Sequence, residues 1–200
     1  MYIVFVCLLV VSVLAKPLVH TQQTQDGHYI VYPDASDDTA QCTEDSRLCI
    51  GSWFAAKNEP HLKELRVTHI VTAIGEPGLG RIPSIKYLVL DLGDHRFQDM
   101  EAAFCASNQF IREALEGDPN AVVFVHCAAG VSRSSSIIIN HWMESQSMTY
   151  DQALEKLVAI RSVVQPNVGF ETQLRAKQVR MAADPDSERK MCERRVKQEL

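Results

Sequence analysis

One ten-residue stretch of the chain carries most of its chemical information: Val125–Ser134, with the sequence VHCAAGVSRS. Within it, five residues separate Cys127 from Arg133, and the stretch follows an apolar run typical of a buried strand. Five residues are enough for the backbone to curl round an anion so that successive N–H groups point inward. The spacing therefore predicts an anion-binding loop with a nucleophile at its base.

Each residue of this loop has an expected part. Cys127 is the candidate nucleophile, because oriented amides and the N-terminus of a following helix favour a thiolate over a thiol. Arg133 can hold two phosphoryl oxygens with its planar fork and stabilise a transition state. Gly130 permits a tight approach of the backbone. The residues expected to bind the substrate phosphate, together with Arg133, are Ala128, Ala129, Gly130, Val131 and Ser132.

The alternative for Cys127 is a small buried hydrophobe, which is the common fate of a free cysteine. The polar run 132–136, directly after the most apolar strand, argues against such a core position. His126 is expected to orient the loop through hydrogen bonds rather than to act as a general base, since strand alternation points it away from Cys127. Ser134 could donate a hydrogen bond to the sulfur, or could serve as a residue that starts the helix.

A series of apolar segments is expected to position this loop. The predicted strands are residues 29–32, 47–51, 67–74, 85–90 and 121–126. Helical spacing predicts helices over 55–65 and 100–116, and Thr149 with Gln152 forms a capping box that opens a further helix. The alternation of strands and helices indicates an α/β domain with helices on both faces of a sheet.

Composition excludes several classes of protein. A chain of 200 residues with 46% hydrophobic side chains can bury a core as one domain, without disulfides or metal. A formal net charge of -5 argues against broad nucleic-acid binding. The six cysteines contain no CxxC pair, so a structural metal site is not expected.

Residues Val125–Ser134 resemble the signature of the cysteine-dependent phosphatases, and the AGVSRS portion is similar to that of the dual-specificity protein phosphatases. Residues 48–52, 67–70, 87–95 and 166–174 resemble the same family, in family order. The resemblance covers about residues 47–180. It implies a phosphotyrosine-phosphatase-like fold: a single α/β domain with a central, mainly parallel five-stranded sheet flanked by helices. It also implies hydrolysis of phosphotyrosine and phosphoserine/threonine through a cysteinyl-phosphate intermediate, with no metal or other cofactor.

This chemistry needs a proton donor for the leaving oxygen, and a carboxylic acid on a separate loop is the usual supplier. Asp91, Asp94 and Asp99 all follow the predicted strand 85–90. The resemblance selects Asp94, which stands just before His95 in a segment similar to the general-acid loop of the family. Asp91 remains the alternative, and could instead cap or form a salt bridge within its loop.

The resemblance also bears on partners. It implies phosphorylated proteins as substrates and a monomeric chain, and the uncharged side chains of Ala128, Ala129 and Val131 disfavour a polyanionic lipid headgroup. Two alternatives stay open: a catalytically silent phosphoprotein-binding module, and a phosphatase acting on a non-protein phosphoester. Arg161 matches an arginine that the family often carries. It is expected to hold the domain together, or alternatively to touch a second substrate phosphate.

The ends of the chain differ from its middle. Residues 1–15, MYIVFVCLLVVSVLA, predict a signal peptide, because the run is shorter than the roughly 20 residues that span a bilayer. Residues 16–46 are expected to be a flexible lead-in, residues 47–180 the catalytic domain, and residues 181–200 a charged tail.

The closing tetrapeptide KQEL resembles a retention signal of the endoplasmic reticulum. The two ends together predict the secretory pathway or the lumen of that organelle. The alternative is the cytoplasm, where a reactive thiolate is normally kept reduced. Loss of Cys7 with a signal peptide would leave an odd number of cysteines, so at least one thiol would be unpaired within the chain.

Overall fold

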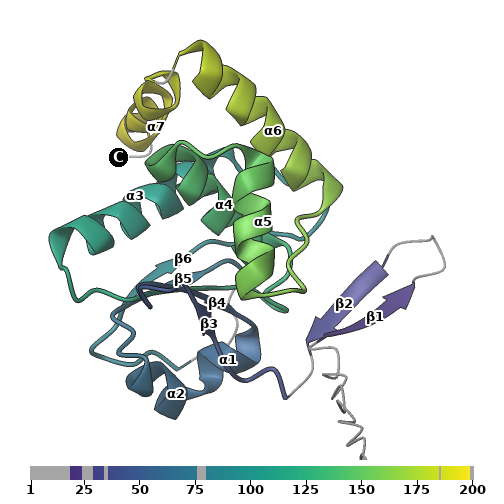
Figure 1. Cartoon of the computed structure of the whole chain (residues 1–200), viewed down its shortest axis with the longest axis vertical. Coiled ribbons are helices and arrows are strands. Elements are labelled where there is room, and N and C mark those ends of the chain that lie inside the picture. Colours follow the sequence, from purple (N-terminus) through teal and green to yellow (C-terminus); the bar gives the residue numbers. More distant parts are fainter. Residues whose placement is uncertain (1–18, 24–28, 34–35, 76–79, 185, 199–200) are drawn as a thin grey trace, which may run out of the picture.

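The computed structural model describes residues 19–23, 29–33, 36–75, 80–184 and 186–198 (Figure 1). The predicted signal peptide, residues 1–15, lies outside these ranges, as do the last two residues of the KQEL sequence. Within the described ranges, no helix is both long and apolar enough to cross a membrane.

A five-stranded sheet forms the centre of the domain, in the order β3-β4-β7-β5-β6. Its strands are β3 (Gln41–Cys42), β4 (Leu48–Gly51), β5 (His69–Thr72), β6 (Lys86–Val89) and β7 (Val123–His126). All neighbouring pairs are parallel except β3 and β4, which run antiparallel. The expectation of a mainly parallel five-stranded sheet is confirmed, and each strand predicted within it is present in a shorter form.

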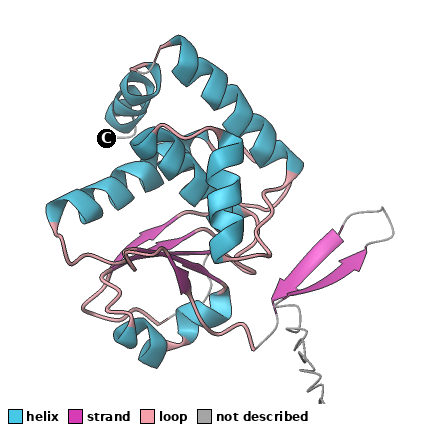
Figure 2. Ribbon diagram, viewed as in Figure 1, coloured by secondary structure: helices cyan, strands magenta, loops and turns pink. Residues whose placement is uncertain are grey.

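Helices cover both faces of this sheet (Figures 1 and 2). The short helices α1 (Trp53–Lys57) and α2 (Glu59–Glu64) lie on one face. The opposite face carries α3 (Glu101–Gly117), α4 (Arg133–Gln146), α5 (Tyr150–Ile160) and α6 (Val168–Ala183), followed by α7 (Ser187–Gln198).

Local sequence explains where two of these helices begin. The single helix predicted over 55–65 is divided in the structure, because Asn58 starts a new helix by accepting a hydrogen bond from His61 N, with Pro60 in the first turn. The predicted capping box of α5 is confirmed: Thr149 Oγ1 accepts from Gln152 N, and Gln152 Oε1 accepts from Thr149 N.

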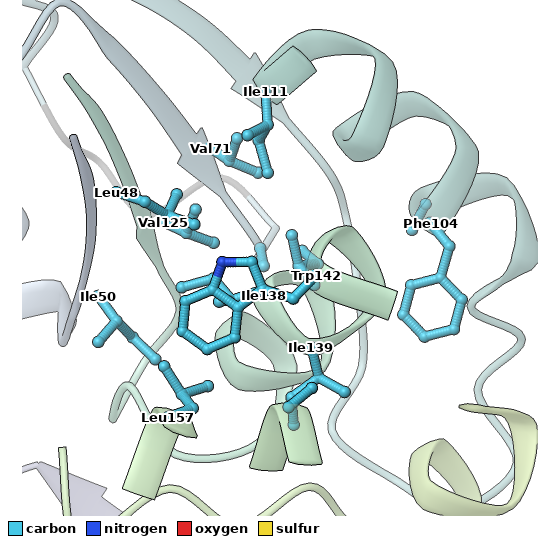
Figure 3. Close-up of a cluster of buried hydrophobic side chains, with 14 of the residues drawn as sticks. Leu48, Ile50, Val71, Phe104, Ile111, Val125, Ile138, Ile139, Trp142 and Leu157 are labelled. Atoms are coloured by element: carbon cyan, nitrogen blue, oxygen red, sulfur yellow. The ribbon is translucent and has the colours of Figure 1, made fainter. Parts of the chain in front are cut away.

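The larger of two hydrophobic clusters lies between the sheet and the α3–α6 layer (Figure 3). Helix α4 runs through it, and Trp142 on this helix is only 2% exposed. All four residues of β7 are buried, because β7 is the central strand and has a helical layer on each face. Strand β7 and helix α4 are therefore the most firmly packed supports for the loop that joins them.

The last part of residues 16–46, the segment expected to be a lead-in, packs onto the domain. Residues 41–42 form edge strand β3, and the side chain of Asp37 is fully buried. Further upstream, β1 (Val19–Gln23) and β2 (Tyr29–Pro33) form an antiparallel hairpin that projects away from the sheet in Figure 1. The folded unit thus begins before residue 47.

The charged tail also packs more closely than its composition suggests. Helix α7 is joined to α3 by a disulfide between Cys105 and Cys192, and Glu188 is 3% exposed beside Arg180 and Lys177. A second disulfide, between Cys42 and Cys49, joins β3 to β4. A chain of this size can bury a core without such bridges, yet the described residues form two.

Candidate active site

Strand β7 ends at His126, and the turn from there into α4 forms a loop of residues 127–133, which we term the phosphate loop. Cys127 at its start is 1% exposed and is the free cysteine of the described chain. Its Sγ lies 3.3 Å from Oγ of Ser134, on the first turn of α4. The expected contact between this serine and the sulfur is present.

The backbone carbonyls of the phosphate loop, from Cys127 to Ser132, all accept hydrogen bonds from surrounding groups. Cys127 accepts from His126 Nδ1, and Ala128 accepts from Trp53 N. Ala129 and Gly130 both accept from Arg161. Val131 accepts from Gln165 N, and Ser132 accepts from the hydroxyls of Ser135 and Ser136. By contrast, none of the backbone N–H groups from Ala128 to Arg133 donates to another residue in the described part of the chain. The loop is thus held by its carbonyls and leaves its amides to an anion.

Gly130 is required by this shape. Its φ is 66°, and a Cβ at this position would lie 2.6 Å from the backbone of Gly51. Only glycine combines the left-handed conformation with such a close approach. The functional assignment of Gly130 therefore has a clear steric basis.

His126 supports the loop from beneath. Burial lowers the pKa of His126 to about 4, and the charge of Arg133 acts in the same direction. The neutral ring donates from Nδ1 to the carbonyl of Cys127, and its Nε2, 2.9 Å from Thr72 Oγ1, accepts from that hydroxyl. A neutral, doubly hydrogen-bonded ring fits the predicted role in orienting the loop.

Asp94 lies on the loop between β6 and α3, which we term the acid loop (residues 92–99). Its Oδ1 accepts hydrogen bonds from Ser132 Oγ at 2.7 Å and from Asn167 Nδ2 at 2.8 Å. Its Oδ2 is 3.4 Å from Nε of Arg133, and the Asp94 side chain is 32% exposed. The structure thus brings Asp94, as predicted, to the edge of the phosphate loop.

Asp91 takes a different direction. Its carboxylate lies against Gly75, where an added Cβ would collide with Oδ1. No hydrogen bond joins it to the phosphate loop within the described residues. The geometry therefore favours Asp94 over Asp91 as the group that serves a bound phosphate.

Arg133 joins the two loops. It begins α4, donates from Nη1 to the carbonyl of Leu92 at 3.1 Å, and is 14% exposed. Its Nε faces Asp94 without completing a hydrogen bond and is buried without another partner. A phosphoryl oxygen placed in the loop would provide the acceptor that this nitrogen lacks.

Some supporting residues were not anticipated as parts of the site. Asn167 caps the start of α6, and its side chain also donates to Asp94 Oδ1. The segment before it contributes Gln165 N, and α1 contributes Trp53 N. A backbone donor carries no side-chain signal, so the sequence pattern could not have revealed the last two.

The site combines a buried thiol, a cradle of free amides, a guanidinium and a carboxylic acid on a facing loop. Such a set can bind a phosphate monoester, transfer its phosphoryl group to sulfur and protonate the leaving oxygen. Within the described ranges, no group of three or more His, Cys, Asp or Glu side chains is placed to hold a metal ion.

Comparison with known proteins assigns the same region to one family. The profile described as "Dual specificity phosphatase, catalytic domain" matches residues 48–180. The chain is 34% identical over 138 residues to Dual specificity protein phosphatase 1 of Arabidopsis thaliana, covering 69% of each chain. It is 37% identical over 128 residues to MAP kinase phosphatase with leucine-rich repeats protein 3 of Dictyostelium discoideum, covering 64% of this chain but only 15% of that protein.

Solved structures agree. The Yvh1 phosphatase domain from Chaetomium thermophilum is 29% identical with a TM-score of 0.65, and the match covers 74% of this chain and all of that one. The human tyrosine phosphatase-like serine/threonine/tyrosine-interacting protein is 28% identical with a TM-score of 0.63, covering 70% and 95%. The family match over residues 48–180 includes strands β4 to β7 and the loop that carries Cys127.

Proposed function

The chain belongs to the dual specificity phosphatase family, and from this we propose that it hydrolyses phosphate monoesters on tyrosine, serine and threonine side chains of proteins. The observation that carries the proposal is the phosphate loop, whose carbonyls are bound from outside while its amides stay free above Cys127. The nucleophile, the guanidinium and the acid all converge there.

The reaction proceeds in two steps. The thiolate of Cys127 attacks phosphorus, a sulfur–phosphorus bond forms, and the bond to the substrate oxygen breaks as Asp94 delivers a proton to that oxygen. Water then attacks the cysteinyl phosphate, Asp94 takes its proton, and inorganic phosphate leaves as the thiolate is restored. Arg133 and the loop amides hold the equatorial oxygens throughout.

Ser134 has a part in the second step. Its Oγ is within hydrogen-bond distance of Cys127 Sγ, so its proton can stabilise the sulfur as the sulfur–phosphorus bond breaks. A better leaving group shortens the lifetime of the cysteinyl phosphate.

Two other functions compete with this proposal: phosphoprotein binding without turnover, and action on a non-protein phosphoester. The presence of Cys127, Arg133 and Asp94 in one site favours turnover. The uncharged side chains at the loop, Ala128, Ala129 and Val131, favour a protein phosphate over a polyanionic lipid.

The experiment is hydrolysis of an aryl phosphate, of phosphotyrosine and phosphothreonine peptides, and of a phosphoinositide. We expect turnover of the first two classes, which Cys127→Ser abolishes while phosphate binding persists. Hydrolysis by Cys127→Ser at the wild-type rate would contradict the mechanism. Binding of phosphopeptides with no turnover by the wild-type protein would identify a binding module, and preference for the phosphoinositide would reassign the substrate.

We also propose that the chain folds in an oxidising compartment, as part of the secretory pathway. Four of the five described cysteines pair in the bridges Cys42–Cys49 and Cys105–Cys192. Disulfides of this kind persist in secretory and extracellular proteins and are rare in the cytosol. Pairing also leaves Cys127 without another free thiol among the described residues with which to form an internal disulfide.

The test is mass spectrometry of the protein isolated from its native cells and alkylated without reduction. We expect one alkylated thiol, at Cys127, and an N-terminus after Ala15. Alkylation of every cysteine would place the protein in a reducing compartment, and an intact Met1 would contradict entry into the secretory pathway.

A further inference from the structure

The most deeply buried ion pair of the described chain lies outside the catalytic groups. Arg161, where α5 ends, and Asp37, upstream of β3, both have fully buried side chains. Asp37 Oδ2 accepts from Arg161 Nη2 at 2.6 Å, and Oδ1 accepts from Nη1 at 3.1 Å. Removing both charges entirely from water costs desolvation free energy, so the burial of this pair needs a physical explanation.

The remaining donors of Arg161 explain why the pair lies at this place in the fold. Nε donates to the carbonyl of Gly130 and Nη2 to the carbonyl of Ala129, both at 2.9 Å. A single guanidinium thus joins Asp37 to two consecutive peptide groups of the phosphate loop. Because it is planar and its donors are fixed relative to one another, the carboxylate on one side sets the direction of the donors on the other.

Peptide geometry carries this constraint into the anion cradle. The described chain contains no cis peptide bond, and in a trans peptide the C=O and N–H groups point in opposite directions. The carbonyls of Ala129 and Gly130 turn outward to Arg161, so the N–H groups of Gly130 and Val131 turn inward. Two of the amides that bind phosphate therefore take their direction from Arg161.

Asp37 is itself anchored to the sheet. Its carbonyl accepts from Ser52 Oγ at 2.6 Å, and the next anchor along the chain is Gln41, which pairs with Ile50 and also accepts from Arg161 Nη1. The bridge Cys42–Cys49 follows immediately. The segment 37–42 is thus held in place beside the phosphate loop by hydrogen bonds, strand pairing and a disulfide.

We propose that Asp37 is a positioning residue for phosphate binding: it holds Arg161 in the orientation that turns two amides of the phosphate loop toward the anion. Asp37 itself never touches the phosphate. The proposal rests on the proposed function, because it specifies how this chain shapes the cradle used in that reaction.

Asp37→Asn tests the role with little change in volume, and Asp38→Asn is the matched control. Asp38 is exposed and contacts only Asn58 among the hydrogen bonds of this region. The readouts are the dissociation constant of inorganic phosphate by calorimetry, and KM and kcat for an aryl phosphate. We expect Asp37→Asn to weaken phosphate binding and raise KM about tenfold, with a smaller change in kcat, because a misdirected donor costs ground-state and transition-state contacts alike. Asp38→Asn should match the wild type.

The double variant Asp37→Leu with Arg161→Met separates positioning from stability. Replacing both members of a buried pair by apolar residues avoids an unpaired charge and often preserves stability. We expect a folded protein, with a melting temperature near that of the wild type, that binds phosphate about tenfold more weakly because both carbonyls lose their donor.

Wild-type phosphate affinity in either folded variant would overturn the proposal. Failure of both variants to fold would also overturn it, because the pair would then be a requirement of the fold itself. Calorimetry keeps this test apart from the proposed function: a wild-type protein that binds phosphate but hydrolyses nothing would disprove the function, while the effect of Asp37→Asn on binding would still decide the positioning role.

Discussion

The phosphate loop and the acid loop meet in one site, but the structure holds them differently. The phosphate loop is buried, and each of its carbonyls from Cys127 to Ser132 is bound by a group outside it. The acid loop lies open to solvent, with Phe97 79% exposed. Its contact with the phosphate loop depends on the Asp94 carboxylate and on the bond from Arg133 to Leu92.

This difference matches the task of each loop. A cradle for a doubly charged group works best when its dipoles are fixed before the charge arrives. A proton donor has to admit a substrate and then approach the leaving oxygen, which the exposed position of the acid loop allows. The loop that binds charge is thus buried and held through its carbonyls, whereas the loop that carries the acid is exposed where a substrate can enter.

The largest effect should come from Gly130→Ala in the rigid loop. A methyl group there meets the backbone of Gly51 and forces a left-handed residue to carry a side chain, so the cradle cannot keep its shape. We expect kcat/KM to fall about 10³-fold, the scale of losing oxyanion donors. Gly117→Ala is the control, because no atom lies within 4 Å of the added group. Near-normal kinetics for Gly130→Ala would mean that the loop is not rigid.

In the acid loop, Asp94→Asn should act on turnover and spare binding. The amide cannot deliver a proton, so kcat for a phosphopeptide should fall about 10²-fold, within the range for general acids. The loss should be smaller for an aryl phosphate, whose leaving group needs less protonation. Asp91→Asn should behave as the wild type, since its carboxylate faces Gly75. If kcat fell in Asp91→Asn and stayed near the wild-type value in Asp94→Asn, the acid role would belong to Asp91.

Acid pH should loosen the support beneath the rigid loop. Burial lowers the pKa of His126 to about 4, and that of His141 on α4 likewise to about 4. Both rings stay neutral in the folded protein while the unfolded chain takes up protons below pH of about 6.5, so stability is present above that pH and is lost as pH falls toward 4.

We expect the free energy of unfolding in urea to drop by up to roughly 3 kcal/mol for each histidine across this window. Replacing His141 by Asn should make the free energy of unfolding depend less steeply on pH. A flat profile between pH 7 and 5 would show that neither ring is held neutral by the fold.

The smallest effect should come from Asn167→Ser, which weakens the hold on the acid loop. Serine keeps the capping acceptor for Gly169 N and Phe170 N but is too short to reach Asp94. We expect kcat to fall about tenfold, in keeping with one lost hydrogen bond to a charged group, with phosphate affinity unchanged. An equal loss of phosphate affinity would mean that the two loops form one rigid unit.

The sequence could predict the parts of this comparison that depend on local pattern. Apolar runs predicted β4 to β7, and the Cys127 to Arg133 spacing predicted the loop with its free amides. It could not predict the contacts that keep the carbonyls outward. Asp37 stands in a polar stretch with nothing to distinguish it from Asp38, and its partner is 124 residues away. Pairings at such separation are made by the tertiary fold and leave no local pattern.

The cysteines show the same limit. The five cysteines that follow the predicted signal peptide are an odd number, which predicted at least one unpaired thiol. Only the packing of β3 on β4 and of α7 on α3 decides which four of them pair. The pairing places the free thiol at Cys127, in the phosphate loop.

The central claim, that Cys127 carries the phosphoryl group within this cradle, can be tested directly by intact-protein mass spectrometry. Asp94→Asn mixed with an aryl phosphate and quenched in acid should accumulate the intermediate, because the leaving group departs without an acid while water lacks a base. We predict the added mass of one phosphoryl group, mapped to Cys127 and absent when Cys127→Ser is introduced. Phosphoryl transfer to any other residue, or turnover with Cys127 never modified, would contradict the account.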